Sequence, residues 1–262
     1  MPEKKGSLIV VGTGIRSVGQ LTTESIAWIE RAEKVFYIVS EPIAESLILR
    51  LNPSAESLQK HYAQGKPRLQ TYQDISDTIL ASVREGKQTC AAFYGHPGVF
   101  VLPSHVAVRQ ARSEGYEARM LPGISAEDCL FADLGVDPAT SGCQAWEATD
   151  FVMNHRNVDP SSSVILWQIG VVGEWTYQQS GYRNSGLPLL IEKLMRYYRP
   201  DHTVVVYEAA VLPGCNPNIR PVPLSHLPSV PLSSASTLYI PPAQPPQPDW
   251  NMYQRLGLTI HS

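Results

Sequence analysis

The chain has 262 residues and a formal net charge of −3, long enough for one large domain or two of ordinary size. So small a charge implies no basic surface field, which makes nucleic acid a poor partner, and no apolar run reaches membrane-spanning length. The start of the chain shows no signal-peptide pattern, and the four cysteines form neither a CxxC pair nor a zinc pattern. We therefore expect a cytoplasmic protein without a metal site.

The first strand is predicted at 7–11, an apolar run typical of a strand that is covered on both faces. A helix follows at about 22–32 with Thr22 or Thr23 as N-cap, then a strand at 34–39 and a helix at 42–51. This alternation predicts a parallel sheet with right-handed crossovers.

The glycine run after the first strand, Gly12 to Gly19, invites comparison with dinucleotide-binding turns. Ser17 stands where the third glycine of G-x-G-x-x-G belongs, although the acidic Glu41 does follow the second strand. A dinucleotide site and an ordinary first turn of a doubly wound sheet both stay open at this point.

Between residues 51 and 71 the periodicity breaks, and Tyr62, Arg68 and Tyr72 fall close together. Helical periodicity resumes from Tyr72 and stops at Glu85-Gly86. A loop of this length is often functional in a compact domain, but it can also be a solvated loop whose tyrosines pack on a neighbour.

A strand at 88–93 leads into the glycine-rich turn Tyr94-Gly95-His96-Pro97-Gly98-Val99-Phe100, and a helix is expected at 103–114. Open α/β sheets bind their ligands at such turns, beyond the carboxyl ends of parallel strands. An ordinary tight strand-to-helix turn is the alternative.

A further strand is expected at 115–121, followed by a helix that Ser125 caps and that runs to Leu134. The N-terminus of that helix can receive a carboxylate. Residues 135–142 are rich in turn formers, so we place the domain boundary there, with one α/β domain at 1–136 and a second at 137–262.

The second domain is predicted to contain a helix at 187–198 and four strands, at 144–148, 163–168, 203–207 and 236–240. Half of the 22 prolines lie between Pro213 and Pro248, so this segment cannot be helical throughout. Residues 222–232 are expected to form turns and edges.

Several motifs together resemble the tetrapyrrole methylase superfamily: 12–14, 94–98, 122–126 and 236–237. The resemblance implies two α/β domains with a cofactor cleft between them, and S-adenosyl-L-methionine as cofactor. The longer motifs at 62–72, 126–134 and 166–170 are similar to one branch, the borosin peptide α-N-methyltransferases related to the omphalotin enzyme. The likeness runs from about Gly6 to Leu258. In this superfamily the first glycine run is not the cofactor cradle, which removes most support for a dinucleotide site.

The resemblance also implies residue roles. The catalytic cluster would be Tyr62, Arg68 and Tyr72. The cofactor contacts would be Tyr94, His96, Val99, Phe100, Ser125, Ala126, Gln168, Ala209, Ser236 and Thr237.

The implied reaction is iterative methylation of backbone amides, with S-adenosyl-L-homocysteine as product. An amide nitrogen is a poor nucleophile because its lone pair is delocalised. Arg68 can stabilise charge on the carbonyl oxygen, and Tyr72 can take the proton directly or through water. Tyr62 can position the carbonyl or share the proton. Two alternatives stay open: a methyltransferase of the superfamily acting on a tetrapyrrole, a corrin or another substrate, and a non-catalytic cofactor-binding module.

Residues 241–248 form a stiff, proline-rich segment, and the residues that follow contain no apolar, glycine-punctuated core sequence. We therefore expect the split type, whose substrate is a separate precursor peptide. The resemblance further implies a homodimer, or a heterotetramer with the precursor.

Overall fold

The computed structural model describes residues 5–257, so expectations on 1–4 and 258–262 lie outside the described part. Its contacts divide the chain into two compact units. The first contains the chain up to Val136 together with Glu174–Tyr182 and Glu208–Asn218, and the second contains Asp137–Gly173, Arg183–Tyr207 and the chain from Ile219 onward. Two short segments of the second half thus fold with the first half, which the sequence did not indicate.

The first unit is built on a five-stranded sheet in the order β3-β2-β4-β1-β5. The strands are β1 (Ser7–Gly12), β2 (Lys34–Ile38), β3 (Glu56–Ser57), β4 (Gln88–Phe93) and β5 (Glu117–Met120). All four pairings are parallel, as predicted. Gly12, the last residue of β1, pairs with Phe93, the last residue of β4. The loops that follow these two neighbouring strands therefore start side by side at the carboxyl ends of the strands.

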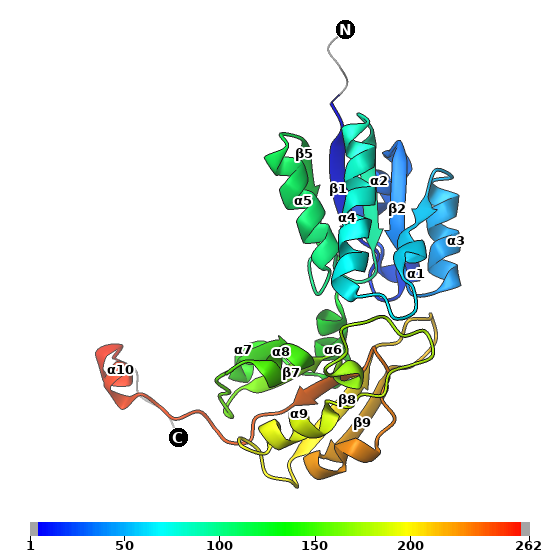
Figure 1. The fold of residues 1–262 in the computed structure, drawn as a ribbon. Coiled ribbons are helices and arrows are strands. Elements are labelled where there is room, and N and C mark those ends of the chain that lie inside the picture. Colours follow the sequence, from blue (N-terminus) through cyan, green and yellow to red (C-terminus); the bar gives the residue numbers. More distant parts are fainter. Residues whose placement is uncertain (1–4, 258–262) are drawn as a thin grey trace. The chain divides into compact units, whose positions relative to one another are not determined.

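Helices cover both faces of this sheet. α2 (Thr23–Arg31) and α3 (Pro42–Leu51) pack on one face. α4 (Arg68–Arg84) and α5 (Leu102–Ser113) pack on the other, where Figure 1 shows them side by side. Leu8 and Val10 point into the core under α4 and α5, whereas Ile9 and Val11 point to the opposite core. The continuous apolar run is explained by this alternation, because both faces of the strand are buried.

Local chemistry sets several helix ends in this unit. The Thr22 side chain accepts a hydrogen bond from Ser25 N and caps α2, as predicted. Ser125 caps α6 (Ala126–Leu134), and Gly135 ends that helix in the left-handed conformation. The short helices α1 (Ser17–Gln20) and η1 (Leu58–His61) lie in the connections after β1 and β3.

The second unit has a mixed five-stranded sheet in the order β6-β7-β10-β8-β9. The strands are β6 (Cys143–Glu147), β7 (Ser163–Trp167), β8 (Thr203–Glu208), β9 (Asn218–Pro223) and β10 (Thr237–Ile240). β6 runs parallel to β7, and β10 runs antiparallel to both of its neighbours. β9 is an edge strand, where Pro221 and Pro223 are tolerated because an edge does not need their missing amide donors.

Two helices of this unit pack on the sheet, α8 (Ala148–Met153) and α9 (Leu187–Leu194). α9 ends at Leu194, before the predicted end at residue 198. The shorter helices are α7 (Pro138–Ser141), η2 (Ile169–Val171) and η3 (Leu224–Ser229). η3 and β9 occupy the region that was expected to form turns and edges.

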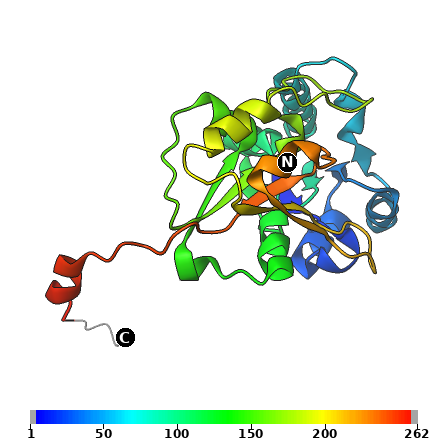
Figure 2. The ribbon, with the colours of Figure 1, turned by 90° about the horizontal axis from the view of Figure 1, so that it is seen from below.

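The proline-rich stretch after β10 leads to α10 (Trp250–Arg255), which Figure 2 shows at the end of an extended segment. Trp250 and Leu256 are largely exposed. In the part of the chain that the structure describes, each helix is too short or too polar to cross a membrane.

Candidate functional site

Three loops meet at the carboxyl edge of the first sheet with their backbones in close contact. Gly14 N donates to Gly95 O at 3.2 Å, and Gly95 N donates to Gly14 O at 3.0 Å. A Cβ atom on Gly12 would lie 2.3 Å from Gly95 O and 3.1 Å from the Cα of Gly123. Glycine at position 12 is therefore required by the approach of the loops that follow β1, β4 and β5.

The turn after β4 is held by hydrogen bonds within its own segment. His96 Nδ1 accepts from Gly98 N at 2.9 Å, so the proton of the neutral ring sits on Nε2. The hydroxyl of Ser104 donates to Pro97 O. The backbone of Phe100 has φ +56°, and the residue is 52% exposed. A left-handed aromatic residue is strained, and such strain gathers at ligand sites.

Tyr94, at the head of this turn, is half-buried, and its amide donates to Ile38 O at 2.8 Å. Burial raises the pKa of its phenol to about 12, with a hydrogen bond to Ser40 acting in the opposite direction. The phenol is therefore neutral and able to donate a hydrogen bond.

Ser125 forms a capping box at the start of α6. Its hydroxyl accepts from Asp128 N at 3.2 Å and donates to Asp128 Oδ2 at 2.7 Å, and its amide donates to the same carboxylate. The side chain is thus occupied within the helix start. The first-turn amides of Ala126 and Glu127 have no acceptor within the helix, so they can hold a ligand.

A hollow of about 380 Å³ adjoins this helix start within the first unit. Its walls include Arg16 and Gln20 from the connection after β1, Cys129 from α6, and Ala210 and Cys215 from the 208–218 segment. Gln20 Oε1 accepts from the amides of Ile15 and Arg16 at 2.9 and 2.7 Å, which closes the connection into a compact turn. The predicted residue Ala209 directly precedes a residue of this wall.

In the second unit, three predicted residues gather where β7 ends and β10 begins. Ser236 O accepts from Ile169 N at 3.0 Å, next to Gln168, and Thr237 is buried at the start of β10. Gln168 has φ +60°, a left-handed conformation that costs a residue with a side chain about 1 kcal/mol. Phe100 and Gln168, both predicted to contact the cofactor, thus each have a strained positive φ.

The catalytic candidates lie in the first unit, but two of them are not in a loop. α4 begins at Arg68, so Arg68 and Tyr72 are four residues apart on one helix face. The sequence analysis began this helix at Tyr72, four residues too late. Its first turn does not continue the apolar stripe of the later turns, because Leu69 faces solvent and is 64% exposed. Tyr62 follows η1 and is half-buried.

The segment 174–182 lies along this cluster, a role that no sequence pattern predicted. Arg68 N donates to Trp175 O at 2.9 Å, Tyr177 N donates to Lys66 O at 2.9 Å, and Gly65 N donates to Tyr177 O at 2.8 Å. The ring of Tyr177 meets that of Tyr62 edge-on at 5.3 Å. The only local hint was the density of aromatic residues between Gly173 and Tyr182.

Tyr62 is surrounded by polar aromatic groups. Burial raises the pKa of its phenol well above the ordinary value of 10.0, and Tyr72 acts in the same direction. Arg68 lowers that pKa, whereas Tyr177 and Tyr182 raise it further. Tyr62 is therefore a neutral hydrogen-bond donor, which suits positioning of a carbonyl better than proton removal.

The remaining loop residues are fixed within the same unit. Lys66 Nζ donates to Asp74 Oδ2 at 2.6 Å and to His61 O at 2.8 Å. His61 Nε2 lies 3.0 Å from the hydroxyl of Thr78. The connection before α4 is thus ordered by α4 itself.

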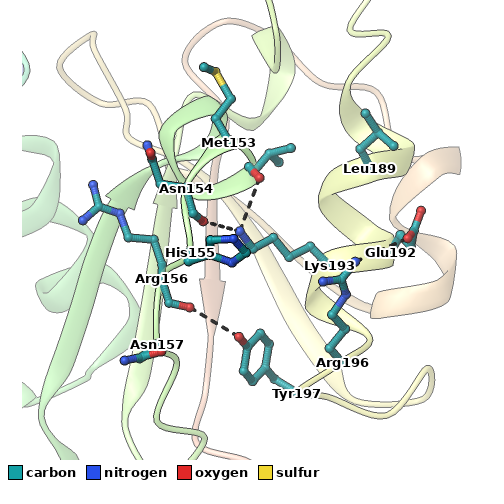
Figure 3. A pocket seen from close by; sticks show the side chains of 11 residues that line it. Met153, Asn154, His155, Arg156, Asn157, Leu189, Glu192, Lys193, Arg196 and Tyr197 are labelled. Carbon is teal, nitrogen blue, oxygen red and sulfur yellow. Dashed lines mark hydrogen bonds and ion pairs between the residues drawn. The ribbon is translucent and has the colours of Figure 1, made fainter.

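A second hollow, of about 290 Å³, lies in the second unit between the end of α8 and α9 (Figure 3). It contains none of the predicted site residues. Lys193 Nζ donates to the carbonyls of Phe151, Val152 and Asn154 and so caps the end of α8. With its donors engaged in this way, Lys193 has a structural role. Residues 5–257 contain no group of three or more His, Cys, Asp or Glu side chains that could hold a metal ion.

Comparison with known proteins identifies the family and the fold of the chain. A family model described as Tetrapyrrole (Corrin/Porphyrin) Methylases matches residues 7–227. The chain is 46% identical over 260 residues to a methyltransferase/ribosomally synthesized cyclic peptide gymnopeptides precursor of Gymnopus fusipes, covering 98% of this chain and 62% of that protein. It is 43% identical over 259 residues to the corresponding omphalotin A precursor of Omphalotus olearius, covering 97% and 62%. The chain thus spans about three fifths of the length of these relatives.

Among solved structures, uroporphyrin-III-C-methyltransferase from Thermus thermophilus has a similar fold, with a TM-score of 0.65 at 19% identity over 98% of this chain and 99% of that chain. This likeness confirms the expected tetrapyrrole-methylase-like α/β fold. Other curated relatives are named as borosin cyclic peptide precursors, the branch that the motifs at 62–72, 126–134 and 166–170 indicated. The chain belongs to the tetrapyrrole (corrin/porphyrin) methylase family.

Proposed function

We propose that this protein transfers methyl groups from S-adenosyl-L-methionine to backbone amides of a precursor peptide, repeatedly along one substrate. The observation that carries the proposal is the cluster of one guanidinium and several phenols around Arg68 and Tyr62. The names of the relatives, which join a methyltransferase to a cyclic peptide precursor, support it.

The residues of the first unit fit such a cofactor. The loops after β1, β4 and β5 approach one another closely at glycines, and Phe100, at the end of the turn that Tyr94 begins, has a strained positive φ. The first-turn amides of Ala126 and Glu127 suit a carboxylate. We propose that Tyr94, His96, Val99 and Phe100 hold the methionine and ribose end. We propose adenine contacts for Gln168, Ala209, Ser236 and Thr237.

The cofactor supplies an electrophilic methyl group; the protein must place and polarise the amide. Arg68 is always charged, and its guanidinium can donate to the carbonyl oxygen on which negative charge grows as the N–H proton leaves. Neutral Tyr62 donates to the same carbonyl and fixes its direction. We propose that Tyr72, which lies one turn after Arg68 on α4, receives the proton directly or through water.

The source of the peptide is a separate question. The relatives' names combine enzyme and precursor in one protein, so the split arrangement, with the peptide on another chain, stays a prediction. Incubation of the chain with a precursor peptide, followed by mass spectrometry of both, tests it. Methyl mass steps on the peptide support transfer in trans, and steps on this chain's own tail would contradict it.

The residue roles are tested by Arg68→Ala and Tyr72→Phe. We expect both variants to lose methyl transfer by at least about a hundredfold, since each removes a group that acts on the reacting amide. Affinity for S-adenosyl-L-homocysteine, measured by calorimetry, should change less than about twofold.

Arg109→Ala and Tyr116→Phe remove the same groups elsewhere in the first unit and serve as matched controls. Loss of cofactor binding in proportion to activity would show that the roles are wrongly assigned. Methylation of a corrinoid while the peptide stays unmodified would favour the alternative substrate class.

We further propose a homodimer, and with the precursor a heterotetramer, on the resemblance alone. The loop before α4 gives no separate support for a dimer, because contacts within its own unit order it. A monomeric mass by light scattering at micromolar concentration would contradict the dimer. The cytoplasmic location also stays a prediction.

A further inference from the structure

We propose that Tyr182 is a positioning residue that fixes the Arg68 guanidinium through the face of its ring. The inference rests on the proposed function, because it concerns the geometry of the same cluster. The guanidinium carbon of Arg68 lies 5.3 Å from the centroid of the Tyr182 ring. This is within the range in which a cation is attracted to an aromatic face.

The segment 174–182 holds Arg68 at two points. The backbone amide of Arg68 donates to Trp175 O at 2.9 Å, and its side chain meets Tyr182 seven residues later. The start of α4 and the direction of its first side chain are thus both set by one segment. This arrangement explains why residues from the second half of the chain fold with the first unit.

Tyr182 is itself fixed by neighbouring groups. Its hydroxyl accepts from Gln178 N at 3.3 Å, which closes residues 178–182 into a turn. The side chain of Gln64 donates to that of Gln178 and accepts from Gln179 N at 2.7 Å. The Gln64 contacts hold the segment that carries the ring without using the Tyr182 hydroxyl, and the 3.3 Å bond to that hydroxyl is long, so a phenylalanine ring would keep its place beside the flexible arginine side chain.

An aromatic partner suits this position better than a carboxylate. Among residues 5–257, the partner seen for the Arg68 guanidinium is the ring of Tyr182, and no ion pair joins Arg68 to a carboxylate of these residues. A ring face holds the planar cation while its N–H groups stay free to donate toward a substrate oxygen. The fixed cation also lowers the pKa of Tyr62, against the effects of burial and of Tyr72, Tyr177 and Tyr182. Without the ring, the guanidinium would sample positions away from the reacting carbonyl.

The test compares Tyr182→Leu, Tyr182→Phe and Tyr182→Trp in the full chain, with Tyr116→Leu as the matched control. We expect Tyr182→Leu to lower kcat about five- to tenfold, the loss that one cation–ring contact implies, with KM for the peptide and cofactor affinity changed less than about twofold. Tyr182→Phe and Tyr182→Trp keep a ring face and should stay within about twofold of wild type. Tyr182→Met replaces the leucine variant if that variant does not fold.

Three results would overturn the inference: Tyr182→Leu within twofold of wild type, Tyr182→Phe as impaired as Tyr182→Leu, or a loss confined to KM. The first excludes any role in turnover, the second points to the hydroxyl rather than the ring, and the third indicates substrate binding. Absence of transfer by the wild-type chain to every peptide offered would instead refute the proposed function, and that outcome is visible before any variant is compared.

Discussion

Replacement of Gly12 by alanine tests the close approach of the three loops that build the candidate site. The new Cβ would lie 2.3 Å from Gly95 O and 2.8 Å from the Pro97 ring, and a backbone oxygen cannot rotate away. Overpacking of this kind costs about 1–3 kcal/mol, and the backbone clash places Gly12→Ala at about 2 kcal/mol or more. For a unit of this size, 2 kcal/mol corresponds to a fall in Tm of about 4–8 °C.

Hydrogen exchange of the 88–93 strand measures this effect where it arises. The slowest amides of β4 should exchange about thirtyfold faster in Gly12→Ala, and affinity for S-adenosyl-L-homocysteine should fall as the turn after β4 is displaced. Gly135→Ala is the control, because Gly135 has φ +64° and no atom within 4 Å of the position that a Cβ would take, so only about 1 kcal/mol of backbone strain applies. If Gly12→Ala is no less stable than Gly135→Ala, the loops do not meet closely.

Three further predictions concern strain, acid stability and thiol reactivity. Gln168→Gly should raise the free energy of unfolding by about 0.5–1 kcal/mol in denaturant titration, because glycine adopts φ +60° without strain. The same variant should bind the cofactor more weakly. A variant less stable than wild type would show that Gln168 is not strained. Hydrogen bonds from Lys34 and Lys60 lower the pKa of Glu56 from 4.5 to about 2, so these contacts stabilise the fold above pH 4.5 and their contribution disappears as pH falls toward 2. In Glu56→Gln the free energy of unfolding should therefore depend less on pH between 4.5 and 2. Cys215 is exposed and should react first with a thiol reagent. Cys90 is buried, and burial raises the pKa of its thiol to about 12, so it should stay unlabelled in the native protein. Labelling of Cys90 would show that β4 opens.

Elements whose signals are local could be predicted from the amino-acid sequence. The run from Leu8 to Val11 predicted a strand buried on both faces, and its alternate side chains do enter two different cores. Thr22 and Ser125 predicted helix starts because an N-cap acts within three residues of itself. The motifs indicated the family, since several of them occur in one order along the chain.

Which distant residues share a site could be seen only in the folded chain. Tyr177 and Tyr182 carry no pattern that assigns them to the first unit, because their partners, Tyr62 and Arg68, lie more than a hundred residues earlier. The start of α4 was hidden for a related reason, since its exposed first turn is fixed by a backbone contact with Trp175 rather than by an apolar stripe. The left-handed conformation of Gln168 was equally invisible, because a glutamine adopts it only where the surrounding fold offsets its strain. Periodicity and capping report interactions within a few residues, whereas the candidate site is made by contacts that only the folded chain brings together.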